Sequence, residues 1–265
     1  MFNFLKKLGP GILFAGAAIG VSHLVQSTRA GADFGIGLIW ALLLVNLFKF
    51  PFFQYGPRYA NATGESLLDG YKKLGKNILS FYILISLATM FTIQTAVTIV
   101  TAGIASSLTN NIISVEIWAI IILTICTVLL YFGKYKMLDR MIKIVISILA
   151  LSTIVATYLA FNNFSYDFKL SQVLPKNNIE IAFLIAFMGW MPAPLDVSVW
   201  HSLWTIEKKK SDGVQEMKTT LFDFNIGYIG TIVLGISFML LGYFVMNGSN
   251  SVSYTHLRAH ETIPD

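Results

Sequence analysis

Long apolar stretches separated by short polar segments run along most of this chain. An α-helix rises about 1.5 Å per residue, so about 20 apolar residues cross the hydrocarbon core of a membrane. Seven segments reach that length, and the pattern therefore predicts seven transmembrane helices. They lie near residues 9–33, 36–60, 77–108, 112–133, 140–162, 178–206 and 219–247.

The first and sixth predicted spans are interrupted near their middles. Gly20 loosens the first span and His23 follows it, whereas Pro192 and Pro194 break the sixth span just before Asp196. In secondary transporters, a pair of broken helices marks the substrate site, and breaks five helices apart fit an inverted repeat of five plus five helices. Two kinks without a site are the alternative, but a carboxylate at mid-membrane is costly and favours a function.

The composition agrees with a membrane protein. The 265 residues are 55% hydrophobic and 12% charged, with a mean hydropathy of +0.67. These values exclude a disordered chain and argue against a soluble enzyme, and no nucleophile–base pair or nucleotide-binding loop is visible. The single cysteine, Cys126, excludes a disulfide framework and a cysteine metal site. We therefore predict neither an enzyme nor a bound cofactor.

The distribution of Lys and Arg predicts the orientation. With the N-terminus in the cytoplasm, fourteen basic residues lie inside and three outside, while Lys49 falls within the second span and Arg258 in the tail. This bias accounts for the net charge of +5 without nucleic acid as a partner. Lys6 and Lys7, followed by an apolar stretch, could also be the start of a signal peptide. The rest of the chain is equally apolar, however, which favours a first transmembrane span over a cleaved signal peptide. We expect a multi-pass protein of a bacterial inner membrane, in contact with lipid.

Several motifs resemble signatures of the Nramp family of divalent-metal transporters, and the resemblance covers residues 1 to about 248. It implies the leucine-transporter-like fold of the amino acid–polyamine–cation superfamily, with alternating access and often proton coupling. It also implies one transmembrane domain over residues 1–250, with a first five-helix repeat at 9–162 and a second repeat that starts at 178–247 and is truncated after the seventh helix. The matching motifs are Gly9-Pro10-Gly11 with Ala30–Gly35 and Leu38-Ile39-Trp40, then Thr63-Gly64-Glu65-Ser66-Leu67, and then Met191-Pro192.

The sequence departs from the family pattern where the family binds metal. The family's Asp-Pro-Gly-Asn motif falls on residues 20–23, so the aspartate ligand is absent and His23 stands in place of the asparagine. Ala193 replaces the histidine that follows Met-Pro in the family. The third span contains no acid or histidine, and Gln94 lies near the place of the family's acidic residue.

The remaining polar residues could still form a mixed metal site, since imidazole, thioether and carboxylate groups all bind transition metals. Met191 could instead fill a gap in the core, His23 could be a hydrogen-bonded helix residue or proton carrier, and Asp196 could pair with His23 or cap the second half-helix. His201, within a His-Ser pair that resembles one in the family, and Asp223 are candidates for proton transfer or gating. The predicted metal ligands are His23, Met191 and Asp196, with backbone carbonyls of Gly20, Met188 and Trp190.

The favoured function is therefore secondary transport of divalent metal ions such as Mn²⁺ or Fe²⁺, with possible coupling to protons. A transporter of another small solute on the same fold is the first alternative; the missing aspartate favours it, whereas Met191 favours a metal. A membrane sensor or scaffold without transport is the second alternative, and the two broken helices argue against it. The sequence leaves the oligomeric state open.

Residues 251–265 differ in character from the rest. Val252–Thr262 resembles a translated sequencing-library adapter, so we predict that this tail is not native. His256 and His260 have a spacing typical of metal ligands in a helix, but we assign them no function.

Overall fold

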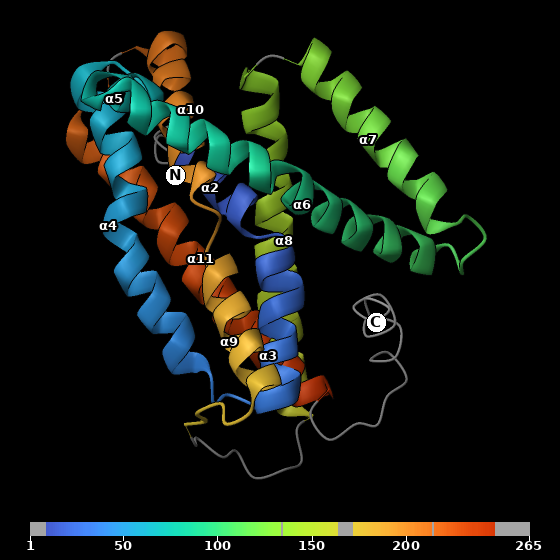
Figure 1. Ribbon diagram of the computed structural model, residues 1–265. Helices are drawn as coiled ribbons and strands as arrows, with labels where there is room; N and C mark the ends of the chain where they lie inside the picture. Colours follow the sequence, from blue (N-terminus) through green and yellow to red (C-terminus); the bar gives the residue numbers. More distant parts are fainter. Residues whose placement is uncertain (1–8, 134, 164–171, 214, 247–265) are drawn as a thin grey trace.

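A computed structural model describes residues 9–133, 135–163, 172–213 and 215–246, and every regular element in these ranges is a helix (Figure 1). The all-α prediction is therefore confirmed for the described residues. In chain order the elements are α2 (Pro10–Ala18), the π-helix η1 (Ser22–Ser27), α3 (Thr28–Phe34), α4 (Ile39–Thr63), α5 (Leu67–Leu74), α6 (Lys76–Leu108), α7 (Val115–Phe132), α8 (Tyr135–Asn162), α9 (Asn178–Trp190), α10 (Asp196–Asp212) and α11 (Met217–Met246).

Six of the seven predicted spans are long and apolar enough to cross a membrane. They comprise α4, α6, α7, most of α8 and α11, together with a span that is bent by 51° between α2 and the segment Ser22–Phe34. The predicted span 178–206 is instead divided into the short apolar helix α9 and the more polar helix α10, which extends past residue 206 to Asp212. Both predicted helix breaks are present, because the prolines and the bend at Gly20 end helices where the sequence indicates.

Helix α11 packs against both halves of the bent first span through glycines. A Cβ atom on Gly227 would lie 1.9 Å from the carbonyl oxygen of Gly11 in α2, and one on Gly242 would lie 1.9 Å from that of Thr28 in α3. Any side chain at these two positions would collide with the facing backbone, so glycine permits the close approach. The backbones of α11 and the first span thus meet on both sides of the first break.

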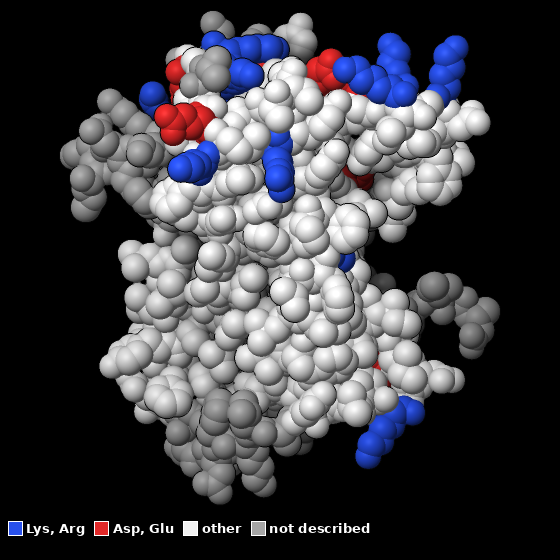
Figure 2. Space-filling model, turned by 90° about the vertical axis from the view of Figure 1, so that its left-hand side faces the viewer, with Lys and Arg blue, Asp and Glu red and all other residues white. Residues whose placement is uncertain are grey.

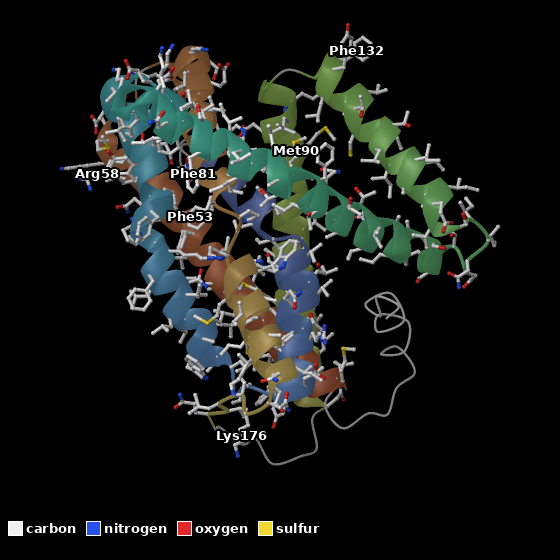
Figure 3. The ribbon with its side chains drawn as sticks, in the orientation of Figure 1. Phe53, Arg58, Phe81, Met90, Phe132 and Lys176 are labelled. Atoms are coloured by element: carbon white, nitrogen blue, oxygen red, sulfur yellow. The ribbon has the colours of Figure 1, made fainter. Side chains whose placement is uncertain are left out.

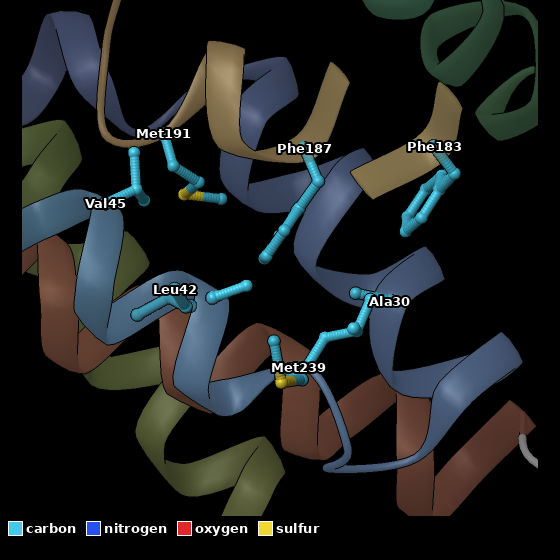
Figure 4. Packing of buried hydrophobic residues seen from close by; sticks show 9 residues of the cluster. Ala30, Leu42, Val45, Phe183, Phe187, Met191 and Met239 are labelled. Carbon is cyan, nitrogen blue, oxygen red and sulfur yellow. The ribbon is translucent and has the colours of Figure 1, made fainter. Parts of the chain in front are cut away.

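A buried apolar cluster joins the elements around the second break (Figure 4). It brings side chains of the loop and helix ends near residue 191 into contact with α3, α4 and α11. Its fully or largely buried members are Ala30, Leu38, Ala41, Leu42, Val45, Phe183, Phe187, Met191 and Met239.

Helices α6 and α7 bury little of their surface in the described part of the chain. Figure 1 shows α6 crossing the other helices obliquely, with α7 beside it, and α7 buries none of its 18 residues. Large apolar side chains are exposed here: Met90 of α6 is 48% exposed and Phe132 of α7 is 76% exposed (Figure 3). Such surfaces suit lipid or further helices rather than water.

Charged side chains are concentrated at the ends of the molecule. Figure 2 shows Lys, Arg, Asp and Glu gathered mostly at one end of the face in view, above a broad band of uncharged residues. This pattern is typical of a protein whose uncharged belt lies in the membrane and whose charged ends lie in water. The structure therefore agrees with an integral, multi-pass membrane protein.

Candidate functional site

The two helix breaks lie side by side. Helix α2, before the first break, packs against α10, which follows the second break, and η1 after the first break packs against α9 before the second. The two broken spans therefore run in opposite directions next to each other. This arrangement brings the ends of four helical segments to one region inside the molecule.

At the first break, side chains satisfy the backbone carbonyl that the end of α2 leaves free. The carbonyl oxygen of Ala18 accepts hydrogen bonds from the Gly20 N–H at 2.9 Å and the Ser22 hydroxyl at 2.6 Å, and it lies 3.0 Å from Nδ1 of His23. A buried carbonyl without a partner would be costly in a membrane. The break at Gly20 is therefore closed by residues of its own span.

His23 is 1% exposed, and protein groups contact both of its ring nitrogens. Nε2 lies 3.0 Å from the carbonyl oxygen of Thr231 in α11, which accepts a hydrogen bond when Nε2 is the protonated ring nitrogen. Nδ1 lies 2.8 Å from the Ser22 hydroxyl as well as close to Ala18. This geometry is that of a hydrogen-bonded helix histidine, and a metal ion could bind the ring only after one of these contacts is broken.

At the second break, a lysine from another helix binds the freed carbonyls. Lys49 lies in α4, and its Nζ donates hydrogen bonds to the carbonyl oxygens of Met188 at 3.0 Å, Gly189 at 2.9 Å and Met191 at 2.7 Å. Pro192 and Pro194 have no N–H and cannot bond these carbonyls. Lys49 therefore caps the C-terminal end of α9, where the helix dipole is negative.

Met191 and Asp196 point towards different neighbours. The Met191 side chain is fully buried among apolar residues of the cluster, and Figure 4 shows it beside Val45 of α4. Asp196 is half-buried at the start of α10, and its Oδ1 accepts hydrogen bonds from the hydroxyls of Tyr82 and Ser86 in α6, both at 2.8 Å. Asp196 also lies in the first turn of α10, where its negative charge suits the helix dipole.

The structure gives separate partners to the three predicted metal ligands His23, Met191 and Asp196. No group of three or more His, Cys, Asp or Glu side chains that could hold a metal ion occurs among the described residues. Of the predicted carbonyl ligands, that of Gly20 accepts backbone hydrogen bonds from residues 23 and 24, that of Met188 binds Lys49, and Trp190 is the last, half-buried residue of α9. The metal site stays a prediction.

The two residues predicted for proton transfer or gating have distinct environments. Asp223 in α11 is 3% exposed, and its Oδ1 and Oδ2 accept hydrogen bonds from the backbone N–H groups of Gly9 and Gly11, each at 2.9 Å. His201 is 1% exposed between the rings of Phe14 and Phe224, and neither of its ring nitrogens has a hydrogen-bond partner among the described residues. Asp223 caps the N-terminus of α2, and the predicted proton or gating role of both residues is untested.

Lys49 is a residue of this site that the sequence motifs do not predict. Its signal is visible in the sequence, because a charged residue near the centre of an apolar span marks a functional position by default. The sequence does not show that Lys49 binds the carbonyl groups at the end of α9, because 140 residues separate Lys49 from Gly189.

One family model and two curated proteins match this chain. The sequence model of the family described as "Natural resistance-associated macrophage protein-like", or Nramp, matches residues 11–262. The chain is 36% identical over 247 residues to an uncharacterized protein of Pasteurella multocida, an alignment that covers 92% of this chain and 57% of that protein. It is 22% identical over 260 residues to the metal transporter NRAT1 of Oryza sativa, which covers 94% of this chain and 46% of that protein.

The chain spans about half the length of these curated relatives. The family match extends into residues 251–265, for which the sequence predicts a tail that is not native. These residues, with His256 and His260, lie outside those that the structure describes, and the division into repeats is likewise untested.

Proposed function

Because this chain belongs to the Nramp family, we propose that the protein is a secondary transporter that moves a divalent metal ion such as Mn²⁺ or Fe²⁺ across a membrane by alternating access. The family assignment supports a transporter rather than an enzyme. The proposed path of the ion runs between the two broken spans. Coupling to protons stays a prediction.

The pairing of the two helix breaks carries this proposal. The packing of α2 on α10 and of η1 on α9 brings the carbonyl ends of α2 and α9 to the same region. Carbonyl oxygens at helix C-termini are partly negative and can hold a cation inside a membrane, where irregular backbone is found only against protein or a cavity. Met191 adds a thioether next to this region.

We further propose that the N-terminus is cytoplasmic and that the protein lies in a bacterial inner membrane. The excess of Lys and Arg on one side of the predicted spans supports this orientation.

Transport into proteoliposomes tests the proposal. Uptake of Mn²⁺, Fe²⁺, Co²⁺ and Mg²⁺ is measured for the purified protein and for Met191→Leu and Asp196→Asn, which preserve side-chain volume while removing the thioether or the charge. Met90→Leu and Asp212→Asn provide matched controls at exposed positions. We expect uptake by the wild type and both controls, and reduced uptake by both site variants.

Unchanged uptake in both site variants would remove Met191 and Asp196 from the metal site. Absence of uptake of all four ions by the wild type would instead favour the alternative, a transporter of another small solute. One observation favours that alternative: the ammonium group of Lys49 is itself a cation at the second break.

A further inference from the structure

Three carbonyl oxygens converge on the ammonium group of Lys49. Those of Met188, Gly189 and Met191 lie 3.0, 2.9 and 2.7 Å from Nζ, so all three hydrogens of the ammonium have an acceptor. The three oxygens belong to the last turn of α9 and the first residue after it, and they form a small cation-binding cage, here called the α9 cage.

The position of Lys49 makes this arrangement unusual. Lys49 is the eleventh of the 25 residues of α4, so its charge lies near the middle of a predicted span. Lys49 forms no ion pair with an acid among the described residues, and the negative end of the α9 dipole is the feature that compensates its charge. An uncharged donor would suffice to satisfy these carbonyl oxygens. Capping of α9 alone therefore does not explain why this position carries a positive charge.

A divalent cation needs the same kind of oxygen atoms at shorter range. Metal–oxygen distances are about 2.0–2.6 Å for Mg²⁺ and Ca²⁺, whereas hydrogen bonds to an ammonium group are about 2.7–3.0 Å long. The α9 cage therefore has the dimensions of an ammonium group, and a metal ion would have to draw the oxygens inward. The cage cannot hold both cations, because two positive charges at its centre would repel each other strongly.

We propose that the amino group of Lys49 is a resident cation that competes with the transported ion for the α9 cage. This inference rests on the proposed function and adds a specificity-determining residue to it. An incoming metal ion binds only if it displaces Lys49, and the return of Lys49 promotes release of the ion. The flexible four-carbon stem of lysine permits such an exchange without movement of α4.

A purely structural cap would behave differently. If Lys49 only stabilised the end of α9, its removal would lower stability and leave metal affinity unchanged or reduced. If Lys49 competes with the ion, removal of its charge raises affinity for the metal. Metal affinity therefore separates the two roles, and stability does not.

The test measures Mn²⁺ binding to the purified protein by electron paramagnetic resonance, in which bound Mn²⁺ is lost from the signal of the free ion. Lys49→Gln keeps hydrogen-bond donors without charge, Lys49→Met removes both, and Lys49→Arg keeps the charge. Lys176→Gln, at an exposed lysine near the lower end of the molecule in Figure 3, is the control. We expect affinity for Mn²⁺ to rise at least about tenfold in Lys49→Gln and Lys49→Met, and to stay unchanged in Lys49→Arg and in the control.

Equal or weaker affinity in folded Lys49→Gln and Lys49→Met would overturn the inference. If these variants do not fold, acetylation of the wild-type protein with an amine-reactive ester decides the question. Mn²⁺ should then increase labelling of Lys49, quantified by mass spectrometry, and leave Lys176 unchanged; equal labelling of Lys49 with and without Mn²⁺ overturns competition.

The uptake assay described above shows whether competition by Lys49 and metal transport fail together or independently. Uptake of Mn²⁺ by the wild type without a gain of affinity in the variants rejects competition and leaves metal transport standing. A gain of affinity in the variants without uptake by the wild type supports competition between Lys49 and a bound metal ion, and it rejects transport of that ion.

Discussion

Replacement of Asp223 by alanine should destabilise the protein strongly. The two carboxylate oxygens of Asp223 accept hydrogen bonds from Gly9 and Gly11, at the N-terminus of α2. Pro10 between them has no N–H, so the carboxylate satisfies both donors that the first residues of this helix present. Its charge also suits the positive end of the helix dipole.

The magnitude follows from these two contacts. A hydrogen bond to a charged group contributes about 1.5–3 kcal/mol, so loss of both would cost up to about 6 kcal/mol. Asp223 borders a small surface pocket with Pro10, Lys208 and Thr220, through which water can reach the vacated N–H groups. We therefore expect a loss near the lower limit, about 3 kcal/mol, which corresponds to a decrease in Tm of about 6–12 °C.

Thermal unfolding monitored by tryptophan fluorescence measures this change. Asp223→Asn should lose roughly half as much, because its amide keeps one acceptor oxygen. Asp212→Ala, at an exposed acid at the end of α10, should change stability by less than about 0.5 kcal/mol. A decrease in Tm of less than about 2 °C in Asp223→Ala would refute the reasoning, and loss of transport at unchanged Tm would favour the predicted proton or gating role instead.

Two further predictions concern α11 and the short helix α5. Gly242→Ala should destabilise the protein by about 1–3 kcal/mol, because the new Cβ would lie 1.9 Å from the carbonyl oxygen of Thr28. A Cβ on Gly230 in the same helix would meet no atom of another described element within 4 Å, so Gly230→Ala should be neutral or stabilising by up to about 1 kcal/mol in the same unfolding assay. The hydroxyl and N–H of Ser66 donate to the carboxylate of Asp69 at 2.6 and 2.9 Å and hold the pKa of Asp69 below its ordinary value of 3.8. The charged form therefore stabilises α5 at neutral pH, so amide-exchange protection factors in α5 should fall as the pH decreases through the folded-state pKa; the same pH dependence in Asp69→Asn would contradict this.

The sequence predicts the spans well because membrane burial leaves a strong signal over about 20 residues. It predicts both breaks for a similar reason, since Pro192 and Gly20 act on the local backbone. The span 178–206 is less well predicted, because hydropathy does not show that α10 continues as a polar helix to Asp212.

The partners of the site residues could not be predicted, because they depend on packing between distant segments. The sequence places Asp196 near the second break, but not beside Tyr82, which lies 114 residues earlier. It likewise shows Asp223 as a lone acid, whereas the partner N–H groups are 212 and 214 residues away. Charge and position alone suggest proton transfer for such an acid, and the helix cap becomes visible only when α2 and α11 are packed together.

The glycine contacts of α11 determine which break can act as a hinge. Bending at Gly20 would have to separate α11 from α2 at Gly227 or from α3 at Gly242. Helix α11 therefore restrains the angle between the two halves of the first span. Helix α4 contacts both α9 and α10 across the second break, but it contains Pro51 and Pro57, which weaken its own hydrogen bonding and let it flex. Rocking motion should therefore concentrate at residues 191–195, while the first span and α11 move as one rigid body.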